Sequence, residues 1–431
     1  MRSVKATRIE WDGSDAGAMA AELRALQPPL AEVSDEVAAI IAEVERDGDA
    51  ALLRLEKKLG GVEPASLRVA TSELAAARAA TDPAVLDALE AAAENIEAVA
   101  ALDRGARTGL NNDLESVTIA DVPLASAGAY VPGGRAAYPS TALMCGVPAR
   151  VAGVGRVAFT SPAGQDGSVN PLVLAAADLL GADEVYAIGG AQAIAALALG
   201  TESVPAVDVI VGPGNRYVQE AKRQLTGRVR IDGIAGPSEL MVIADGAVEA
   251  RLLALDLCAQ TEHGDDGLLV ACAPEASLLE ELERLVAELA RQRPSVGHSP
   301  LALVTTPTTG AAVELANALA PEHLQLACAD ADDLVDAVRS AGCVFVGRCG
   351  ATAFGDYAAG SNHVLPTGGA GRFQGPLGPA TFRRRLATVR ITERGAAELA
   401  PVVATLAEAE GFPVHGESAT ARASEPEGRS R

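Results

Sequence analysis

The sequence has no run of about eighteen uncharged apolar residues, so it predicts no membrane-spanning helix. Its first residues, MRSVKATRIEWDG, include basic side chains but lack the apolar segment that follows them in a secretory signal. The six cysteines form no C-x-x-C pair, which favours reduced, mostly buried thiols over a disulfide framework or a zinc knuckle. We therefore expect a cytoplasmic protein, and we assign no role to any cysteine.

Basic side chains are also scarce, with 35 Lys and Arg against 57 Asp and Glu and a net charge of −22. So acidic a surface repels nucleic-acid phosphates and anionic lipids, so neither nucleic acid nor a membrane is an expected partner. A chain of 431 residues with 49% apolar content can bury a large core, and two or three domains are expected. The favoured partner is a small soluble ligand.

Two helices are predicted in the N-terminal part. Apolar residues recur at helical spacing between Ser34, a possible N-terminal cap, and a break at Gly48. A second such run spans 83–102, with Asp82 as a possible cap and a proline in its first turn. We interpret the apolar faces of both helices as core contacts rather than as sites.

From about Tyr130 the sequence repeats a strand, a glycine-containing turn and a helix. This repeat is typical of a parallel sheet with crossover helices, in which ligands bind at the carboxyl ends of the strands. The predicted strands span 157–160, 185–188, 207–211 and 240–243, and the predicted helices span 171–180, 191–199 and 216–225.

A second α/β block follows. Its first helix has Asp245 as a possible cap and Gly264 as its stop. Beyond Ser418 the chain is polar, small and charged, so we expect 418–431 to be disordered. In this block the predicted helices span 248–262 and 276–291, and the predicted strands span 268–271, 302–305 and 344–346.

One polar stripe lies on the predicted helix that ends at Gly264. Asp256, Gln260 and His263 follow one another at helical spacing, so the amide oxygen of Gln260 and the imidazole of His263 could converge on a cation. Glutamine is an uncommon metal ligand. The spacing alone therefore favours a solvated helix end, with His263 near the negative end of the helix dipole, over a metal site.

Glu322 and His323 are adjacent, and a carboxylate beside an imidazole offers two general bases whose pKa values can be tuned apart. The pair is expected where a short turn leads into a strand. Neighbouring residues on a strand point to opposite faces, so both side chains reach one ligand only if the backbone there is irregular.

Three loops could hold a ligand. The loop 355–369 contains Asp356 and His363, and long glycine-rich loops place ligands more often than they build cores. The loops 130–134 and 212–215 let the backbone approach a ligand closely, and the second opens a helix whose N-terminus favours phosphate. Neither is the G-x-G-x-x-G fingerprint of a dinucleotide site.

Near the C-terminus, Glu410 and His415 lie five residues apart after a helix-like run. By themselves they are typical of an ordinary charged tail.

Together these segments resemble the histidinol dehydrogenase family, motif by motif from Tyr130 to about Thr367. The helical N-terminal part agrees in pattern only, and the C-terminal part agrees mainly through Glu410 and His415. The matching motifs are AYVPGG, YPSTALM, GVPAR, IGGAQAIAALALGT, VDVIVGPGNRYVQEAKR, IAGPSELMVIAD, AQTEHG, APEHLQL and GDYAAGSNHVLPTGG.

The resemblance implies one zinc ion per subunit, held by four protein ligands, and so reverses the expectation from spacing for Gln260 and His263. Family enzymes are intertwined homodimers with shared active sites, so His415 is expected to complete the zinc site of the other subunit and a monomer to be inactive. The implied zinc ligands are Gln260, His263, Asp356 and His415.

The resemblance also implies the remaining roles. Glu322 and His323 match the catalytic pair, and Tyr130, Gln192 and Asn215 match the positions that bind NAD. The substrate contacts it implies are Ser238, Gln260, His263, His323, Asp356, His363, Glu410 and His415.

The implied reaction is a four-electron oxidation of L-histidinol to L-histidine, through L-histidinal, with two NAD in turn. His323 would take the alcohol proton, and Glu322 would activate water at the aldehyde stage. Two other hypotheses are a paralogous zinc- and NAD-dependent alcohol dehydrogenase with a different amino alcohol or polyol, and a catalytically silent binding protein of the same fold. Retention of Ser238, His363 and Glu410 argues against the paralogue.

The fold implied is α/β, with two Rossmann-like parallel-sheet domains and small N- and C-terminal helical segments. The expected divisions are an N-terminal segment 1–25, a catalytic domain 26–129 with 245–378, an NAD domain 130–244 and a dimerisation segment 379–417.

One departure concerns Thr352. Family members often have an acidic residue shortly before the glycine-aspartate-tyrosine motif, and this chain has Ala351-Thr352-Ala353-Phe354 there. Hydrogen bonds from that carboxylate would be missing, so a weaker hold on the metal is expected.

Overall fold

The structure is a computed structural model that describes residues 6–28, 32–133 and 136–423. It divides into two units, one of Met1–Asp103 with Leu124–Phe382 and one of Arg104–Pro123 with Arg383–Arg431. Gly134 of the predicted glycine loop and 424–431 of the predicted disordered tail lie outside the described residues. No described helix combines the length and apolar character needed to cross a membrane.

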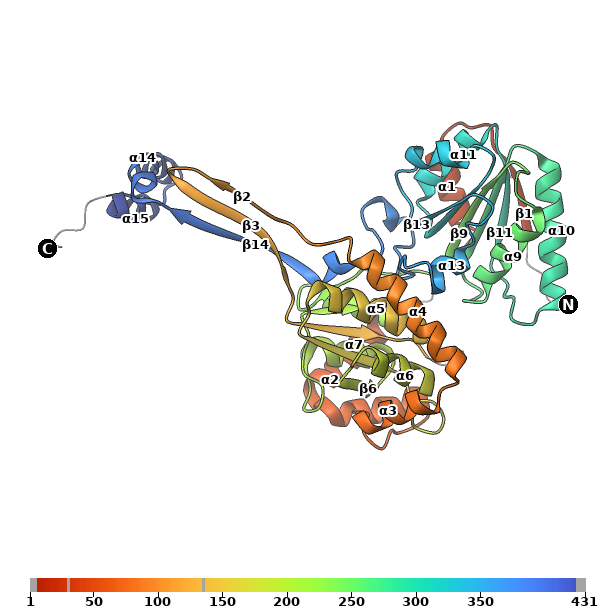
Figure 1. Ribbon diagram of the computed structural model, residues 1–431, viewed down its shortest axis with the longest axis horizontal. Coiled ribbons are helices and arrows are strands. Elements are labelled where there is room, and N and C mark those ends of the chain that lie inside the picture. Colours follow the sequence, from red (N-terminus) through yellow and green to blue (C-terminus); the bar gives the residue numbers. More distant parts are fainter. Residues whose placement is uncertain (1–5, 29–31, 134–135, 424–431) are drawn as a thin grey trace, which may run out of the picture. The chain divides into compact units, whose positions relative to one another are not determined.

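The first unit contains a six-stranded sheet in which every neighbouring pair is parallel (Figure 1). Alternate residues of its strands face opposite sides, so Val242 packs toward α9 and α10 while Ile243 packs toward α1 and α11. In sheet order the strands are β1 (Ala6–Glu10), β11 (Leu301–Thr305), β10 (Leu268–Ala273), β9 (Glu239–Ala244), β12 (His323–Ala327) and β13 (Cys343–Val346). The helices are α1 (Ala16–Arg24), α9 (Ala250–Thr261), α10 (Ala276–Gln292) and α11 (Thr309–Leu319), and two short ones, α12 (Ala331–Leu334) and α13 (Thr352–Tyr357), belong to the same part of the chain.

A five-stranded parallel sheet completes this unit. Its order is β6 (Glu184–Ala187), β5 (Arg156–Ser161), β4 (Ser126–Tyr130), β7 (Val209–Val211) and β8 (Arg230–Ile231). One face packs on α2 (Ser34–Leu55), α7 (Gly190–Leu199) and α8 (Arg216–Leu225), and the other packs on α3 (Thr71–Ala80), α4 (Pro83–Ala100), α5 (Pro139–Ala152) and α6 (Pro171–Leu179).

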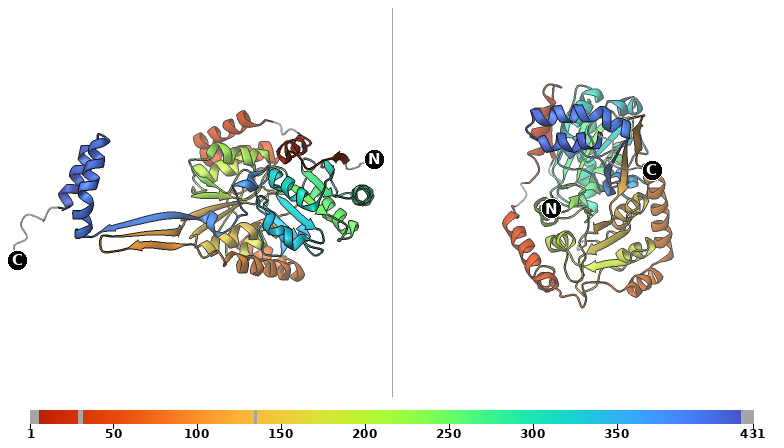
Figure 2. Two further views of the ribbon diagram at one scale, coloured as in Figure 1. Left: turned by 90° about the horizontal axis from the view of Figure 1, so that it is seen from above. Right: turned by 90° about the vertical axis from the view of Figure 1, so that its left-hand side faces the viewer.

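The second unit is an antiparallel ribbon followed by two packed helices (Figure 2). Its buried residues are few and small, such as Ala400 and Ala407, whereas Val389, Leu406 and Val414 are exposed. The elements are β2 (Arg107–Asn111), β3 (Glu115–Pro123), β14 (Arg383–Ile391), α14 (Glu393–Ala409) and α15 (Pro413–Ala423).

Several predictions about local structure are confirmed. Helix α8 has the predicted bounds, and the Asp82 side chain accepts the N–H of Ala84 at the start of α4. The predicted break at Gly48 is a non-helical residue inside α2, with φ 54°. All six cysteines are free, and four of them are buried: Cys145, Cys258, Cys272 and Cys328.

Other predictions are wrong. Strand β9 does not close the series that starts at Tyr130 but pairs with β10 and β12 in the six-stranded sheet. The helices expected in the catalytic domain 26–129 pack on the five-stranded sheet instead, and the N-terminal segment supplies β1 and α1 to the six-stranded sheet. The sequence of a strand that is apolar on both faces does not indicate which sheet the strand joins, and this explains these errors.

Two further corrections concern helix ends. The possible cap Asp245 does not cap α9, which begins after Glu249; its carboxylate accepts the N–H groups of Ala247 and Ala329 instead. Residues 418–423, expected to be disordered, belong to α15.

A buried ion pair fixes the predicted loop 212–215. Nζ of Lys222, whose side chain is 1% exposed, donates to the Gly212 carbonyl at 2.6 Å and to Oδ1 of Asp232 at 2.7 Å. Oδ2 of Asp232 accepts the N–H of Gly212 at 2.7 Å. Gly212 has φ +109°, and a Cβ there would collide with the Tyr130 carbonyl, so glycine is required. The pair therefore holds the loop against the end of β4.

Substitution of Lys222 by Met is expected to lower the free energy of unfolding by about 3–5 kcal/mol, because Asp232 is left as a buried, unpaired carboxylate. Adding Asp232→Asn should recover part of the loss. The measurement is urea unfolding. The exposed Lys58 supplies the control, since Lys58→Met should change stability by at most about 0.5 kcal/mol; equal effects of the two lysine substitutions would contradict this role.

Candidate active site

Glu322 and His323 follow an irregular turn. Helix α11 ends at Leu319, and the next residue, Ala320, is buried and lies in the left-handed region with φ 48°. Strand β12 begins at His323 after Pro321. Glu322 thus precedes the strand, and both side chains line one pocket. The irregular backbone that the sequence requires for a joint site is present.

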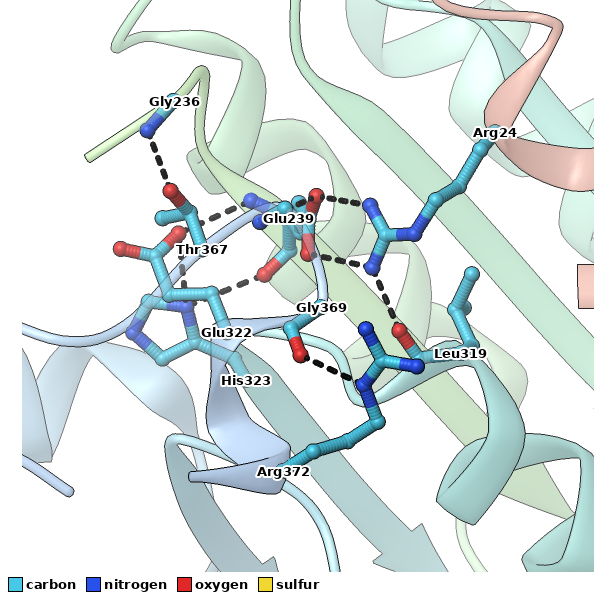
Figure 3. Close-up of polar contacts among 10 residues, drawn as sticks. Arg24, Gly236, Glu239, Leu319, Glu322, His323, Thr367, Gly369 and Arg372 are labelled. Carbon is cyan, nitrogen blue, oxygen red and sulfur yellow. Dashed lines mark hydrogen bonds and ion pairs between the residues drawn. The ribbon is translucent and has the colours of Figure 1, made fainter. Parts of the chain in front are cut away.

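The backbone of Glu239 on β9 binds both side chains. Its N–H donates to Oε2 of Glu322 at 2.8 Å, and its carbonyl oxygen lies 3.1 Å from Nδ1 of His323 (Figure 3). A carbonyl oxygen can only accept, so Nδ1 carries a hydrogen and Nε2 is the ring nitrogen left to exchange a proton. Nε2 lies 3.4 Å from Oδ1 of Asp356 and has no hydrogen-bond partner among the described residues.

The carboxylates around His323 stabilise the charged form that the ring takes on when it accepts a proton. Burial alone would lower the pKa of His323, but the carboxylates of Glu322 and Asp356 outweigh it and raise that pKa well above its ordinary value. For Asp356, burial would raise the pKa, but the neighbouring His323 lowers it below the usual range. The ring also stacks on Phe345, with centroids 5.8 Å apart.

Gln260, His263 and Asp356 line the same pocket and form a set of metal-type donors. Gln260 is 3% exposed, and within the described part of the chain neither its amide oxygen nor its nitrogen has a hydrogen-bond partner. A buried amide without partners costs about 1–3 kcal/mol, which fits a group that accepts a ligand from the pocket. The expectation of a solvated helix end is therefore wrong for Gln260, although His263 is exposed.

This set of metal-type donors consists of one carboxylate, one imidazole and one amide. Among the described residues, no three His, Cys, Asp or Glu side chains form a group that could hold a metal ion. His263 and Asp356 are two such side chains, and the amide of Gln260 adds an oxygen. These three donors fit a divalent cation that has further coordination positions to fill.

Both ring nitrogens of His363 form hydrogen bonds. Nδ1 donates to the carbonyl oxygen of Asp356 at 2.8 Å, which leaves Nε2 to accept the hydroxyl of Thr141 at 3.0 Å. Burial lowers the pKa of His363, which favours the neutral ring. Thr141 was not singled out from the sequence, although it lies in the YPSTALM motif.

The pocket has a volume of roughly 1650 Å³, more than one small ligand needs. Of the residues predicted to bind cofactor, Asn215 lines it and Tyr130 and Gln192 do not. Glu410 and His415 belong to the other unit, where both are exposed. The predicted residues that the structure brings together here are Ser238, Gln260, His263, Glu322, His323, Asp356, His363 and Asn215.

Tyr130 and Gln192 meet at a buried turn. The hydroxyl of Tyr130 accepts the N–H of Gly190 at 3.1 Å, and the carboxylate of Glu56 accepts from Gly189 N–H at 2.9 Å and from Nε2 of Gln192 at 2.8 Å. Burial raises the pKa of Glu56 and raises that of Tyr130 to about 12. Glu56 was missed because a single glutamate in a helical run gives no sign that it faces inward.

Asn215 begins α8 as its cap. Its side-chain oxygen accepts the N–H groups of Tyr217 at 3.0 Å and Val218 at 3.2 Å. The helix N-terminus at the pocket therefore starts at a residue predicted to bind the cofactor.

The family model described as histidinol dehydrogenase matches residues 26–423 of this sequence. The chain belongs to the histidinol dehydrogenase family.

Curated histidinol dehydrogenases resemble it over nearly their whole length. The chain is 41% identical over 415 residues to the histidinol dehydrogenase of Pseudomonas syringae pv. syringae (strain B728a), covering 92% of this chain and 90% of the relative. It is 43% identical over 399 residues to that of Haloarcula marismortui, covering 90% and 93%. The crystal structure of histidinol dehydrogenase from Elizabethkingia anophelis superposes with a TM-score of 0.89 at 30% identity, covering 98% of each chain.

In this histidinol dehydrogenase family member, Thr352 is buried in the first turn of α13, the helix that carries Asp356. A buried carboxylate does lie on the neighbouring α9, where Oδ2 of Asp256 accepts from Nε2 of Gln325 at 2.8 Å. Burial raises the pKa of Asp256. The weaker metal affinity expected from Thr352 stays a prediction.

Two buried glutamines allow a matched test of the donor set. In metal-free protein, Gln260→Leu is expected to raise the free energy of unfolding by about 1–3 kcal/mol, because two unpartnered polar atoms are removed. Gln325→Leu should lower it by a similar amount, because Nε2 of Gln325 donates to Asp256 and to the Gly350 carbonyl. Urea unfolding with excess chelator compares them, and a loss of stability in both variants would count against an unfilled ligand position at Gln260.

Proposed function

We propose that this protein oxidises L-histidinol to L-histidine, through L-histidinal, with zinc and two NAD. One observation carries the proposal: in a chain of this family, the Glu322–His323 pair and the metal-type donors Gln260, His263 and Asp356 line one pocket. The pocket has room for a small substrate beside a dinucleotide.

Gln260, His263 and Asp356 would hold the zinc ion, with His415 of a second copy as the fourth ligand. Zinc, when bound, supplies a positive charge that holds the nitrogens of an amino alcohol and favours loss of its hydroxyl proton. The exposed position of His415 on α15 supports a homodimer with shared active sites, because an exposed side chain is free to reach a second copy.

Asn215 at the start of α8 would hold NAD, and Tyr130 and Gln192 would shape the glycine turn behind it. NAD, when bound, accepts the hydride. Both Tyr130 and Gln192 are buried and bonded to groups of the Gly189–Gly190 turn or to Glu56. Their part in cofactor binding is therefore to fix the backbone of that turn.

At the alcohol stage, Nε2 of His323 takes the hydroxyl proton as hydride leaves the carbon. The hydrogen bond from Nδ1 to the Glu239 carbonyl fixes the ring, so Nε2 is the atom presented to the substrate. Asp356, beside Nε2, favours the positive charge that His323 gains.

At the aldehyde stage, Glu322 activates water. One carboxylate oxygen, Oε2, is bound by the Glu239 N–H, and the other is not bonded within the described part of the chain. A second base is needed because substrate and water lose their protons at different steps. After His323 has released its first proton to solvent, the hydrate loses its second hydride and His323 accepts the proton of the hydrate hydroxyl.

Ser238 and His363, which line the pocket, would bind the substrate. Glu410 would join them from the same C-terminal segment as His415. A carboxylate there suits a substrate with a positively charged amino group, which favours an amino alcohol over an anionic substrate. We place the reaction in the cytoplasm.

The purified protein is expected to release two NADH per L-histidinol, counted by absorbance at limiting substrate. A chelator should abolish the reaction and added zinc should restore it. Failure to reduce NAD with histidinol, together with turnover of another alcohol from a small panel, would favour the paralogous dehydrogenase instead.

Glu322 and His323 act at different stages, so substitutions of the two residues should have different kinetic effects. Glu322→Gln should slow oxidation of L-histidinal by about 10²-fold or more and affect the alcohol stage less, whereas His323→Asn should slow both stages. Single-turnover measurements started with the alcohol or with the aldehyde separate the stages. Indistinguishable kinetics for the two variants would refute the assignment.

A further inference from the structure

Behind the Glu322–His323 pair lies an ion pair between the N-terminal helix and β9. Nη1 of Arg24, at the end of α1, lies 2.6 Å from Oε1 of Glu239, whose side chain is only 2% exposed. Figure 3 shows Glu239 between Arg24 on one side and the pair on the other. Neither Arg24 nor Glu239 is among the residues that line the pocket.

Glu239 is also the residue whose backbone binds both members of the pair. Its N–H holds Glu322 and its carbonyl holds His323. A shift of the β9 backbone at this residue would therefore move both side chains together. The Glu239 carboxylate restrains such a shift, because it is held by Arg24 and by the N–H of Gly368 at 3.1 Å.

Arg24 also contacts the turn that precedes Glu322 and His323 in the chain. Its Nη2 donates to the carbonyl oxygen of Leu319, the last residue of α11. The next residue is Ala320, whose left-handed backbone is unfavourable for a residue with a side chain. One guanidinium thus ties β9 to the strained turn that leads into Glu322 and His323.

We propose that Arg24 and Glu239 are positioning residues of this active site: they hold the backbone segments that orient Glu322 and His323. The proposal rests on the proposed function of that pair. Burial raises the pKa of the Glu239 carboxyl, and Arg24 offsets this, so loss of Arg24 would leave an unpaired group under the pair.

The kinetic test uses Arg24→Met, Arg24→Lys and Glu239→Gln, assayed as turnover per folded, zinc-loaded subunit. Arg24→Met and Glu239→Gln should each lower kcat about 10–100-fold with KM for histidinol within about threefold, because a misplaced base slows chemistry more than binding. The kcat of Arg24→Lys should lie between those of Arg24→Met and the unaltered protein, because an ammonium lacks the planar set of donors with which the guanidinium binds both Glu239 and Leu319.

The control is Arg8→Met. Arg8 on β1 also pairs with glutamates, Glu280 and Glu283, but at the surface, and its loss should leave kcat unchanged. The double variant Arg24→Met/Glu239→Gln should be no slower than the slower single variant, because both changes remove one contact.

A second readout does not depend on activity. In metal-free protein labelled with ¹⁵N-histidine, the His323 signal, identified by its loss in His323→Asn, should shift in Arg24→Met and in Glu239→Gln but not in Arg8→Met. Unchanged kcat per folded subunit, or an unmoved His323 signal, overturns the proposal. If the unaltered protein does not oxidise histidinol, the proposed function fails, and the His323 signal alone decides the positioning role.

Discussion

The peptide groups of Glu239 are the constraint on which the candidate site depends. One N–H and one carbonyl on β9 bind Glu322 and His323, which come from the beginning of the adjacent parallel strand. The two side chains can share a pocket only because Ala320 and Pro321 turn the chain sharply before β12. The positions of Glu322 and His323 therefore depend on the pairing of β9 with β12 and on the strained turn that precedes β12.

Much of the local structure could be predicted from the sequence. The α8 helix and the Asp82 cap follow from apolar spacing and capping chemistry, which act over a few residues. Sheet membership could not be predicted, because β9 is buried on both faces and carries the same apolar pattern in either sheet. The ribbon of the second unit was missed as well, since β3 pairs with β14 from a distant part of the chain and most of its residues are partly exposed.

The types of residue in the candidate site could be predicted from the sequence, but the residues that hold them in place could not. Helical spacing singled out Gln260 and His263, but only the fold shows that the Gln260 amide is buried and has no partner among the residues that the structure describes. Glu56, Arg24 and Glu239 gave no sign in the sequence, because an ordinary charged residue is assumed to face water. Their importance arises from contacts between segments that lie far apart in the chain.

The pairing of β3 with β14 has a consequence for the newly made chain. Pro123 pairs with Arg383, about 260 residues later. At a synthesis rate of roughly 5–20 residues per second, the edge of β3 stays open for about 15–50 s after it leaves the ribosome. A two-stranded hairpin is marginally stable in water, and an open edge invites pairing with a neighbouring nascent chain. We therefore expect the fraction of newly made protein that does not aggregate to depend on translation speed and on chaperone binding to this hairpin.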